Sequence, residues 1–170
     1  MRAKLVLLLL AFVFTAFRPG IDGNEGNEYQ IKAMFVFNFI KYVEWPTTNP
    51  STEFTIGVIG ESEITEPLER IAVQKKVGEK KIIIKKLALE DDTYCDIIIV
   101  SRSRSNKLVM LEKRYANKGI LIISDEAPNP ATINLITRES KVRFEINVAL
   151  AKNCGVKISS QLLTLAVAVH

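Results

Sequence analysis

Histidine is nearly absent from this 170-residue sequence, because the one histidine is the last residue, His170. That argues against Ser-His-Asp triads, Cys-His nucleophiles and histidine-rich metal sites, which all need an imidazole at the reacting centre. Cysteine is also scarce, and two cysteines exclude a disulfide-dense miniprotein. No combination of base, nucleophile and orienting residue stands out. We therefore expect neither an enzyme nor a bound metal or cofactor.

The composition lacks any extreme of charge. Charged residues make up 25% of the chain and hydrophobic residues 48%, which are ordinary globular values. The formal net charge of +4 falls to +2 once residues 1–23 are set aside. The basic isoelectric point is thus partly an effect of the N-terminus and does not by itself indicate nucleic-acid binding, for which cations usually cluster on one face.

A secretory leader is predicted at the N-terminus. Arg2 and Lys4 precede an apolar run over residues 5–17, which is the pattern of a signal peptide. The run is shorter than the roughly 20 residues that span a bilayer; a membrane anchor or a buried helix is the alternative. We expect residues 1–23 to be a signal peptide, without a clean cleavage motif, and residues 28–170 to form a single exported domain.

The most apolar stretch after the leader covers residues 29–45. It is apolar on nearly all sides, which predicts a helix covered on most of its faces and ended by the following proline. A membrane segment is the alternative, but Lys32, Asn38 and Lys41 make it costly. We expect Asn38 to have a structural role, as a satisfied buried amide or in a close helix contact. Residues 21–28 are predicted to be a solvated linker.

Strands and helices are predicted to alternate through the middle of the chain. Apolar runs that suit strands buried on both faces are separated by helical patterns, which is typical of βαβ units and a parallel arrangement. The fold class is therefore α/β, with a mixed, partly parallel sheet and helices packed on its faces as a layered sandwich. The predicted strands cover residues 54–60, 80–87, 95–100 and 120–123, and the predicted helices begin at Pro67 and near Leu108.

The last third of the chain predicts a β-hairpin and a helix. Residues 131–137 and 141–147 form the two expected strands, and the second alternates apolar with polar residues. Asn147 is expected to cap a short helix that stops at Gly155. A final helix is predicted from Ser159 or Ser160 to Val169.

Two polar stretches are candidate binding sites. Arg143 and Glu145 lie two residues apart on one strand and point the same way; they form either a contact for a partner or ligand, or the solvated side of the sheet. Arg102 and Arg104 lie in residues 101–107, where a strand meets a helix N-terminus. Such a place binds anions through free N–H groups, and a solvated loop is the alternative.

Cys95 and Cys154 are the two cysteines. In an oxidising compartment a disulfide between them is one prediction, and it needs Cα atoms within about 7 Å. Two separate buried thiols that act as small hydrophobic side chains are the other prediction.

Three stretches together resemble one known family. They are residues 31–46 (IKAMFVFNFIKYVEWP), 142–147 (VRFEIN) and 156–163 (VKISSQLL). With a leader before them, they are similar to the YfiR-like family of exported bacterial proteins. The resemblance implies a periplasmic α/β protein, often dimeric, that regulates by binding.

The best-known members of that family hold a membrane-bound diguanylate cyclase inactive by contacting its periplasmic part, and relief of the hold raises cyclic-di-GMP and biofilm formation. The resemblance also implies a position for Cys95, where a family cysteine is found. The upstream cysteine expected within residues 67–78 is absent, and Cys154 matches no family cysteine.

The sequence thus predicts a periplasmic regulatory binding protein that controls a membrane signalling protein of the diguanylate cyclase type by direct contact. Its partner is expected to be the periplasmic domain of an inner-membrane protein, with a homodimer through apolar surfaces as a further expectation. Neither nucleic-acid binding nor a membrane span in the mature form is expected. The alternative is a small-ligand module that senses an anion or nucleotide at residues 101–107.

Overall fold

The computed structural model describes residues 25–46 and 51–170. The predicted leader, residues 1–23, lies wholly outside the described residues. In the described part of the chain, no helix has the length and apolar character needed to cross a membrane.

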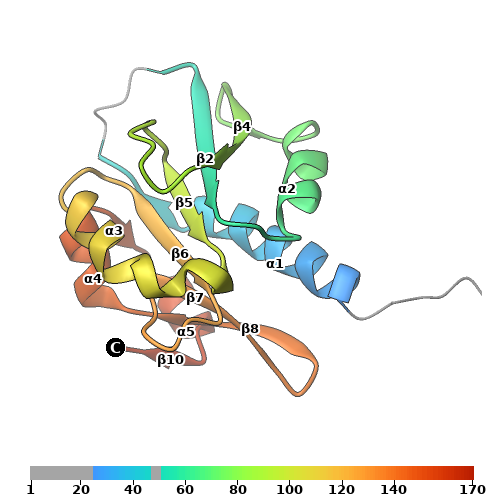
Figure 1. Ribbon diagram of the computed structural model, residues 1–170, viewed down its shortest axis with the longest axis vertical. Coiled ribbons are helices and arrows are strands. Elements are labelled where there is room, and N and C mark those ends of the chain that lie inside the picture. Colours follow the sequence, from blue (N-terminus) through green and yellow to red (C-terminus); the bar gives the residue numbers. More distant parts are fainter. Residues whose placement is uncertain (1–24, 47–50) are drawn as a thin grey trace, which may run out of the picture.

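An eight-stranded sheet forms the centre of the fold, with the strand order β10-β8-β7-β6-β5-β2-β4-β3 (Figure 1). Five neighbouring strands are parallel, while β8 returns antiparallel to β7 and β3 lies antiparallel to β4. The predicted mixed, partly parallel sheet is confirmed. In sheet order the strands are β10 (Ala168–Val169), β8 (Lys141–Ile146), β7 (Ile133–Arg138), β6 (Leu121–Asp125), β5 (Ile97–Val100), β2 (Glu53–Ile59), β4 (Lys80–Leu87) and β3 (Lys76–Val77).

Helices cover both faces of this sheet. From β2 the chain crosses to β4 on one side of the strand order, and from β5 it crosses to β6 on the other. Because such crossovers are right-handed, their helices lie on opposite faces. The first helix, α1, contacts both α2 and β8 and shares the face of α2. The helices are α1 (Glu25–Ile40), α2 (Thr65–Ala72), the 3₁₀ helix η1 (Arg102–Lys107), α3 (Leu108–Arg114), α4 (Val148–Cys154) and α5 (Ser160–Leu165).

The core lies between α1 and the sheet and within the central strands. All four residues of β5 and all five of β6 are buried, as expected for parallel strands that are covered on both faces. Phe144 of β8 packs against Phe39 and Phe35 of α1, with ring centroids 5.0 Å and 5.6 Å apart. Aromatic contacts of this kind fix how α1 sits on the sheet.

The first helix differs from its prediction in its bounds and at Asn38. It begins at Glu25, inside the stretch predicted as a linker, and ends at Ile40, after which Val43–Glu44 forms the short strand β1. β1 pairs with β9 (Lys157–Ile158), so tertiary pairing replaces the last helical turn. Gln30, Met34 and Asn38 form one exposed stripe and the other residues from Tyr29 to Ile40 are buried or half-buried, so the predicted helix covered on most of its faces is confirmed. Because Asn38 is exposed, the prediction of a buried role for it is wrong.

The C-terminus differs as well. Ser159 caps α5, accepting a hydrogen bond from Leu162 N at 3.3 Å, but the helix ends at Leu165. Val167 N then donates to Phe144 O at 3.0 Å, and β10 pairs with β8. The predicted helix to Val169 is therefore wrong at its end. The free edge of β8 offers backbone partners that a terminal helical turn lacks, and valine suits a strand.

Other predicted end signals are confirmed. Pro67 lies in the first turn of α2. The Asn147 side chain caps α4 by accepting a hydrogen bond from Leu150 N at 3.0 Å. Gly155 ends that helix with φ +82°, a left-handed conformation that favours glycine.

Candidate functional site

The outermost strand β10 and its surroundings carry exposed apolar side chains. Leu165 is 62% exposed, Val167 52%, Val169 48% and Val148 41%. Val148 belongs to this group because its backbone N–H donates to His170 O at 2.9 Å, which holds the start of α4 beside β10. We call Val148, Leu165, Val167 and Val169 the C-terminal edge.

The C-terminal edge is also open in its backbone. β10 stands last in the strand order, and among the described residues no strand pairs with its outer side. An edge strand presents unpaired N–H and C=O groups and is a template for another chain, and folded proteins usually blunt such edges with charge. No charged side chain follows Lys157. This edge therefore has the chemistry of a docking site for a polypeptide.

Arg143 and Glu145 lie on β8, next to this edge, and Glu145 is opposite Ala168 of β10. The Glu145 carboxylate is 3.3 Å from Arg138 Nη2 and accepts a hydrogen bond from Asn134 Nδ2 at 3.4 Å. Arg143 is exposed, makes no ion pair within the described residues, and donates to Val142 O at 3.2 Å. Of this predicted pair, only Arg143 has a charge that is not matched by another described residue.

A groove of about 520 Å³ adjoins the C-terminal edge and shares Val148 with it. Its apolar wall includes Trp45, Pro46 and Leu163. The ion pair between Lys157 and Glu44, with N and O 3.2 Å apart, lies at the same groove. The exposed apolar surface of the edge therefore continues into a hollow that can receive a side chain.

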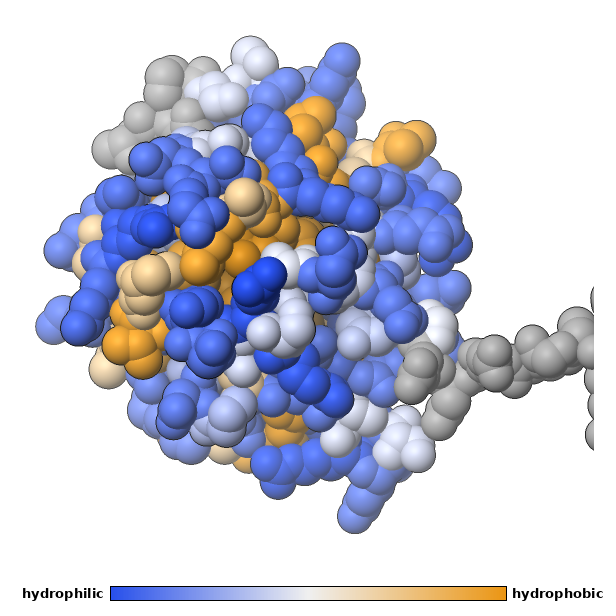
Figure 2. All heavy atoms as spheres, in the orientation of Figure 1, coloured by the Kyte–Doolittle hydropathy of each residue, from blue (hydrophilic) through white to orange (hydrophobic). Residues whose placement is uncertain are grey.

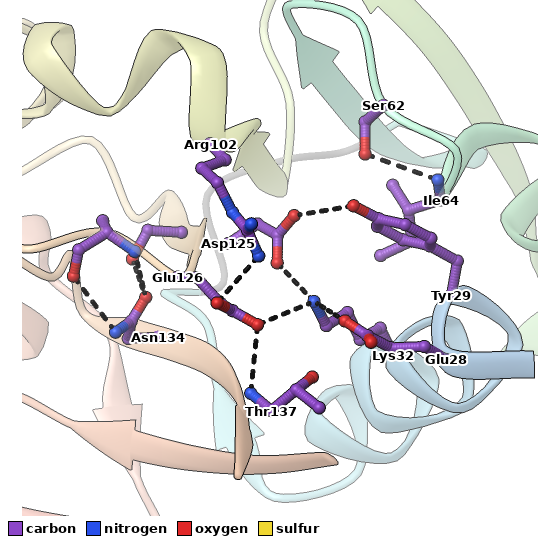
Figure 3. A network of polar contacts seen from close by, with 12 residues as sticks. Glu28, Tyr29, Lys32, Ser62, Ile64, Arg102, Asp125, Glu126, Asn134 and Thr137 are labelled. Carbon is purple, nitrogen blue, oxygen red and sulfur yellow. Dashed lines mark hydrogen bonds and ion pairs between the residues drawn. The ribbon is translucent and has the colours of Figure 1, made fainter. Parts of the chain in front are cut away.

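A second polar feature centres on Lys32 of α1 (Figure 3). This lysine is fully buried. Its Nζ lies 2.6 Å from Asp125 Oδ1 and 2.6 Å from Glu28 Oε1, and 3.7 Å from Glu126 Oε1. Tyr29 donates to Asp125 Oδ2 at 3.3 Å. These contacts tie α1 to the C-terminal end of β6.

The charges of this network support one another. Burial by itself lowers the pKa of Lys32, but hydrogen bonds and charge from Asp125 and Glu28 outweigh it and raise the pKa. Burial likewise favours a higher pKa for Glu28, and the contacts with Lys32 bring it below the usual value. Burial and the Asp125 carboxylate raise the pKa of Tyr29. The network is thus a satisfied ionic clamp, which removal of one member would leave with a buried unpaired charge.

Comparison with known proteins agrees with this architecture. A family model described as YfiR/HmsC-like matches residues 29–167. The chain belongs to the YfiR/HmsC-like family. Members of this family are periplasmic regulators of signalling, and the resemblance carried by the three sequence stretches is confirmed. A search of curated proteins found no match.

In this YfiR/HmsC-like chain, the predicted anion site falls on η1. Arg102 Nη2 is 2.7 Å from Glu126 Oε2, so its charge is paired within the chain and it joins the Lys32 network through Glu126. Arg104 is exposed, and its Cγ lies 2.6 Å from where a Cβ on Gly60 would be. Gly60 has φ +86° and permits this approach. Of the two predicted arginines, Arg102 is thus matched by an acid of the chain, and Arg104 lies against Gly60.

The two cysteines are free and buried. Cys95 packs against Gly57, where an added Cβ would meet its Sγ at 2.9 Å, whereas Cys154 Sγ is 3.7 Å from Thr132 Oγ1. Burial, with help from Asp96, raises the pKa of Cys95 to about 11 against the opposing charge of Lys85. Each thiol has its own neighbours and no bridge joins them in the structure.

Sequence reasoning missed both the Lys32 network and the C-terminal edge. A signal existed for the first, since a lysine buried in an apolar helix needs a buried anion, and Asp125 lies two residues after the apolar run 120–123. The second was hidden because residues 166–169 were predicted to be helical. Only the pairing of β10 with β8 turns alternate valines into an exposed strand edge.

Proposed function

We propose that this protein is exported to the periplasm by a signal peptide at residues 1–23 and regulates a membrane signalling protein of the diguanylate cyclase type by contact. The C-terminal edge binds the periplasmic domain of that partner and holds it inactive. The protein acts without a chemical step of its own.

The observation that carries the proposal is the exposed apolar edge strand. Four large exposed apolar side chains gather at and around β10, and no charged side chain follows Lys157 in the sequence. Covering each of these half-exposed side chains contributes roughly 1 kcal/mol to binding. A strand added to β10 also satisfies its open backbone groups, which gives a regulator affinity and a defined orientation.

Arg143 supplies the polar rim of this contact. It is exposed beside β10 and carries no ion pair within the described residues. Arginine at the margin of an apolar patch binds carboxylates of a partner in a defined geometry. Glu145 acts as a support, because its carboxylate holds Arg138 and Asn134 in place.

The test is site-specific photo-crosslinking in living cells. A photoreactive phenylalanine analogue replaces Val167 at the edge or, as the control, Met110 of α3, which is 39% exposed on another surface. We expect the Val167 position to form an adduct with an inner-membrane protein that carries a cyclase domain, and the Met110 position to form none. An adduct only with a second copy of this chain would make the edge a dimer interface and contradict the proposal.

The small-ligand alternative stays a prediction. Of its two arginines, Arg102 is already paired with Glu126. No observation at residues 101–107 favours it over contact through the C-terminal edge.

A further inference from the structure

The opposite end of the sheet has a contrasting chemistry. Residues 73–86 contain six lysines and one glutamate, a local charge of +5. The described residues outside this segment carry a net charge of −3. A modest total charge therefore conceals a dense local group of cations, which can attract an anionic surface. We call these side chains the lysine edge: Lys75, Lys76, Lys80, Lys81, Lys85 and Lys86.

The lysines lie close together and on the outer strands. β3 and β4 form an antiparallel pair in which Lys76 is directly opposite Lys81. Like charges opposite one another destabilise a sheet. Lys75, Lys76 and Lys81 are exposed and form no ion pair within the described residues. The fold therefore holds unmatched positive charge at a place where it costs stability.

Apolar surface accompanies this charge. Val73, at the end of α2, is 88% exposed, the largest exposure among the large apolar side chains described. A groove of about 350 Å³ opens beside it, with an apolar lining that includes Met34 and Val77 and with lysines that include Lys75 and Lys76. Figure 2 shows orange patches over β4 and over the end of α2, each bordered by blue side chains.

We infer that the lysine edge and Val73 dock the protein on an anionic phospholipid bilayer. A projecting apolar side chain surrounded by lysines is suited to a membrane surface, where the apolar group enters the headgroup layer and the ammonium groups stay with the phosphates. All cations of the edge are lysines. A protein partner recognised through carboxylates would favour arginine with its fork of donors, whereas lysine acts as a point charge and suits a diffuse negative surface.

Protection of a sheet edge is the competing explanation, since lysines prevent edge-to-edge pairing. It accounts for lysines on β3 and β4, but not for the exposed valine or for the apolar groove beside them. Bilayer docking accounts for all three features. This inference does not depend on which protein the C-terminal edge binds.

The test measures how the mature protein partitions onto vesicles without any other protein. Vesicles of phosphatidylcholine with 30% phosphatidylglycerol are compared with pure phosphatidylcholine at about 0.1 M salt, where the Debye length is about 10 Å. We expect binding to the anionic vesicles only, and its loss at about 1 M salt. Each lysine near such a surface contributes roughly a factor of five, so the triple variant K75Q/K76Q/K81Q is expected to bind roughly a hundred-fold more weakly.

A matched control removes the same charge elsewhere. Lys113, Lys141 and Lys152 are exposed and form no ion pair within the described residues, and K113Q/K141Q/K152Q is expected to lower binding by no more than about threefold, as a general charge effect. Val73→Ser is expected to weaken binding severalfold while leaving the folded state intact. Urea unfolding of K75Q/K76Q/K81Q checks that its loss of binding is not a loss of fold.

Two results would overturn the inference. One is no binding of the natural protein to anionic vesicles at low salt, which would leave edge protection as the role of the lysines. The other is an equal loss of binding in both triple variants, which would mean that total charge and not this surface governs the interaction. Because the vesicles contain no signalling protein, neither result bears on the proposed contact through the C-terminal edge.

Discussion

The two ends of the sheet both expose backbone groups of an outer strand, but they carry opposite kinds of side chain. Both β10 and the β3–β4 pair are outer strands with backbone groups that face away from the sheet. The β4 end carries six lysines, and the β10 end carries valine and leucine without a charged side chain after Lys157. An edge that is charged resists a second polypeptide, whereas an uncharged apolar edge accepts one. The molecule thus has one end suited to a protein and one suited to a charged surface.

Neither edge stabilises the fold that carries both of them. The Lys32 network does so, by tying α1 to β6. Lys32→Met leaves the buried Asp125 and the half-buried Glu28 without their cation. We expect the free energy of unfolding to fall by about 3–5 kcal/mol, measured by urea denaturation. The control Lys41→Met, at an exposed lysine close to the same helix, should change it by less than about 0.5 kcal/mol. Equal effects of the two substitutions would show that the clamp is not what holds α1.

The C-terminal edge can be made to resemble the lysine edge by placing lysines on it. Val167→Lys combined with Val169→Lys removes two exposed apolar side chains and adds charge to β10. We expect affinity for the partner identified by crosslinking to fall roughly 30-fold, because about 2 kcal/mol of apolar burial is lost. Calorimetric titration measures it. Val109→Lys, at a 57% exposed position of α3, is the control, and undiminished affinity of the double variant would rule out β10 as the contact.

Low pH is expected to weaken the Lys32 network, and so the stability of the fold, before it changes either edge of the sheet. The pKa of Glu28 in the folded protein lies below the ordinary 4.5, since contacts with Lys32 outweigh burial. A carboxylate of this kind stabilises the fold above its unfolded pKa, and the contribution is lost as the pH falls through the folded value. Between pH 5 and pH 3 we expect the stability of the natural protein to fall more steeply than that of Glu28→Gln, measured by urea denaturation at each pH. Parallel pH profiles would contradict this role of Glu28.

The smallest expected effect is a gain in the free energy of unfolding when charge is removed from the lysine edge. Lys76→Gln with Lys81→Gln removes the like charges that face each other across β3 and β4. We expect the free energy of unfolding to rise by about 0.2–1 kcal/mol, more at low salt than at high salt. Urea denaturation at two salt concentrations measures the gain. A loss of stability would mean that these lysines support the hairpin instead of straining it.

Much of the sheet was predictable from the sequence because its signals are local. The runs that form β5 and β6 are continuously apolar, whereas a half-exposed strand alternates apolar with polar residues. Pro67, Asn147 and Gly155 mark helix ends through their own side-chain and backbone chemistry. Such features depend on a few neighbouring residues and survive folding unchanged.

The functional surfaces were not predictable in the same way, because they depend on residues far apart in the chain. Lys32 and Asp125 are separated by 93 positions, and only the topology brings them together. Residues 166–169 are compatible with a helix until β8 offers them a strand partner. The exposure of Arg143 and the pairing of Arg102 with Glu126 likewise follow from neighbours that the local pattern does not contain.

Backbone hydrogen exchange tests the central claim most directly. Amide exchange of the mature protein is compared with and without the purified periplasmic domain of its signalling partner. We predict slower exchange over residues 160–170 on binding and no change over residues 75–86 or 101–107. Protection confined to residues 101–107 or to the lysine edge, with residues 160–170 unaffected, would contradict regulation through the apolar end of the sheet.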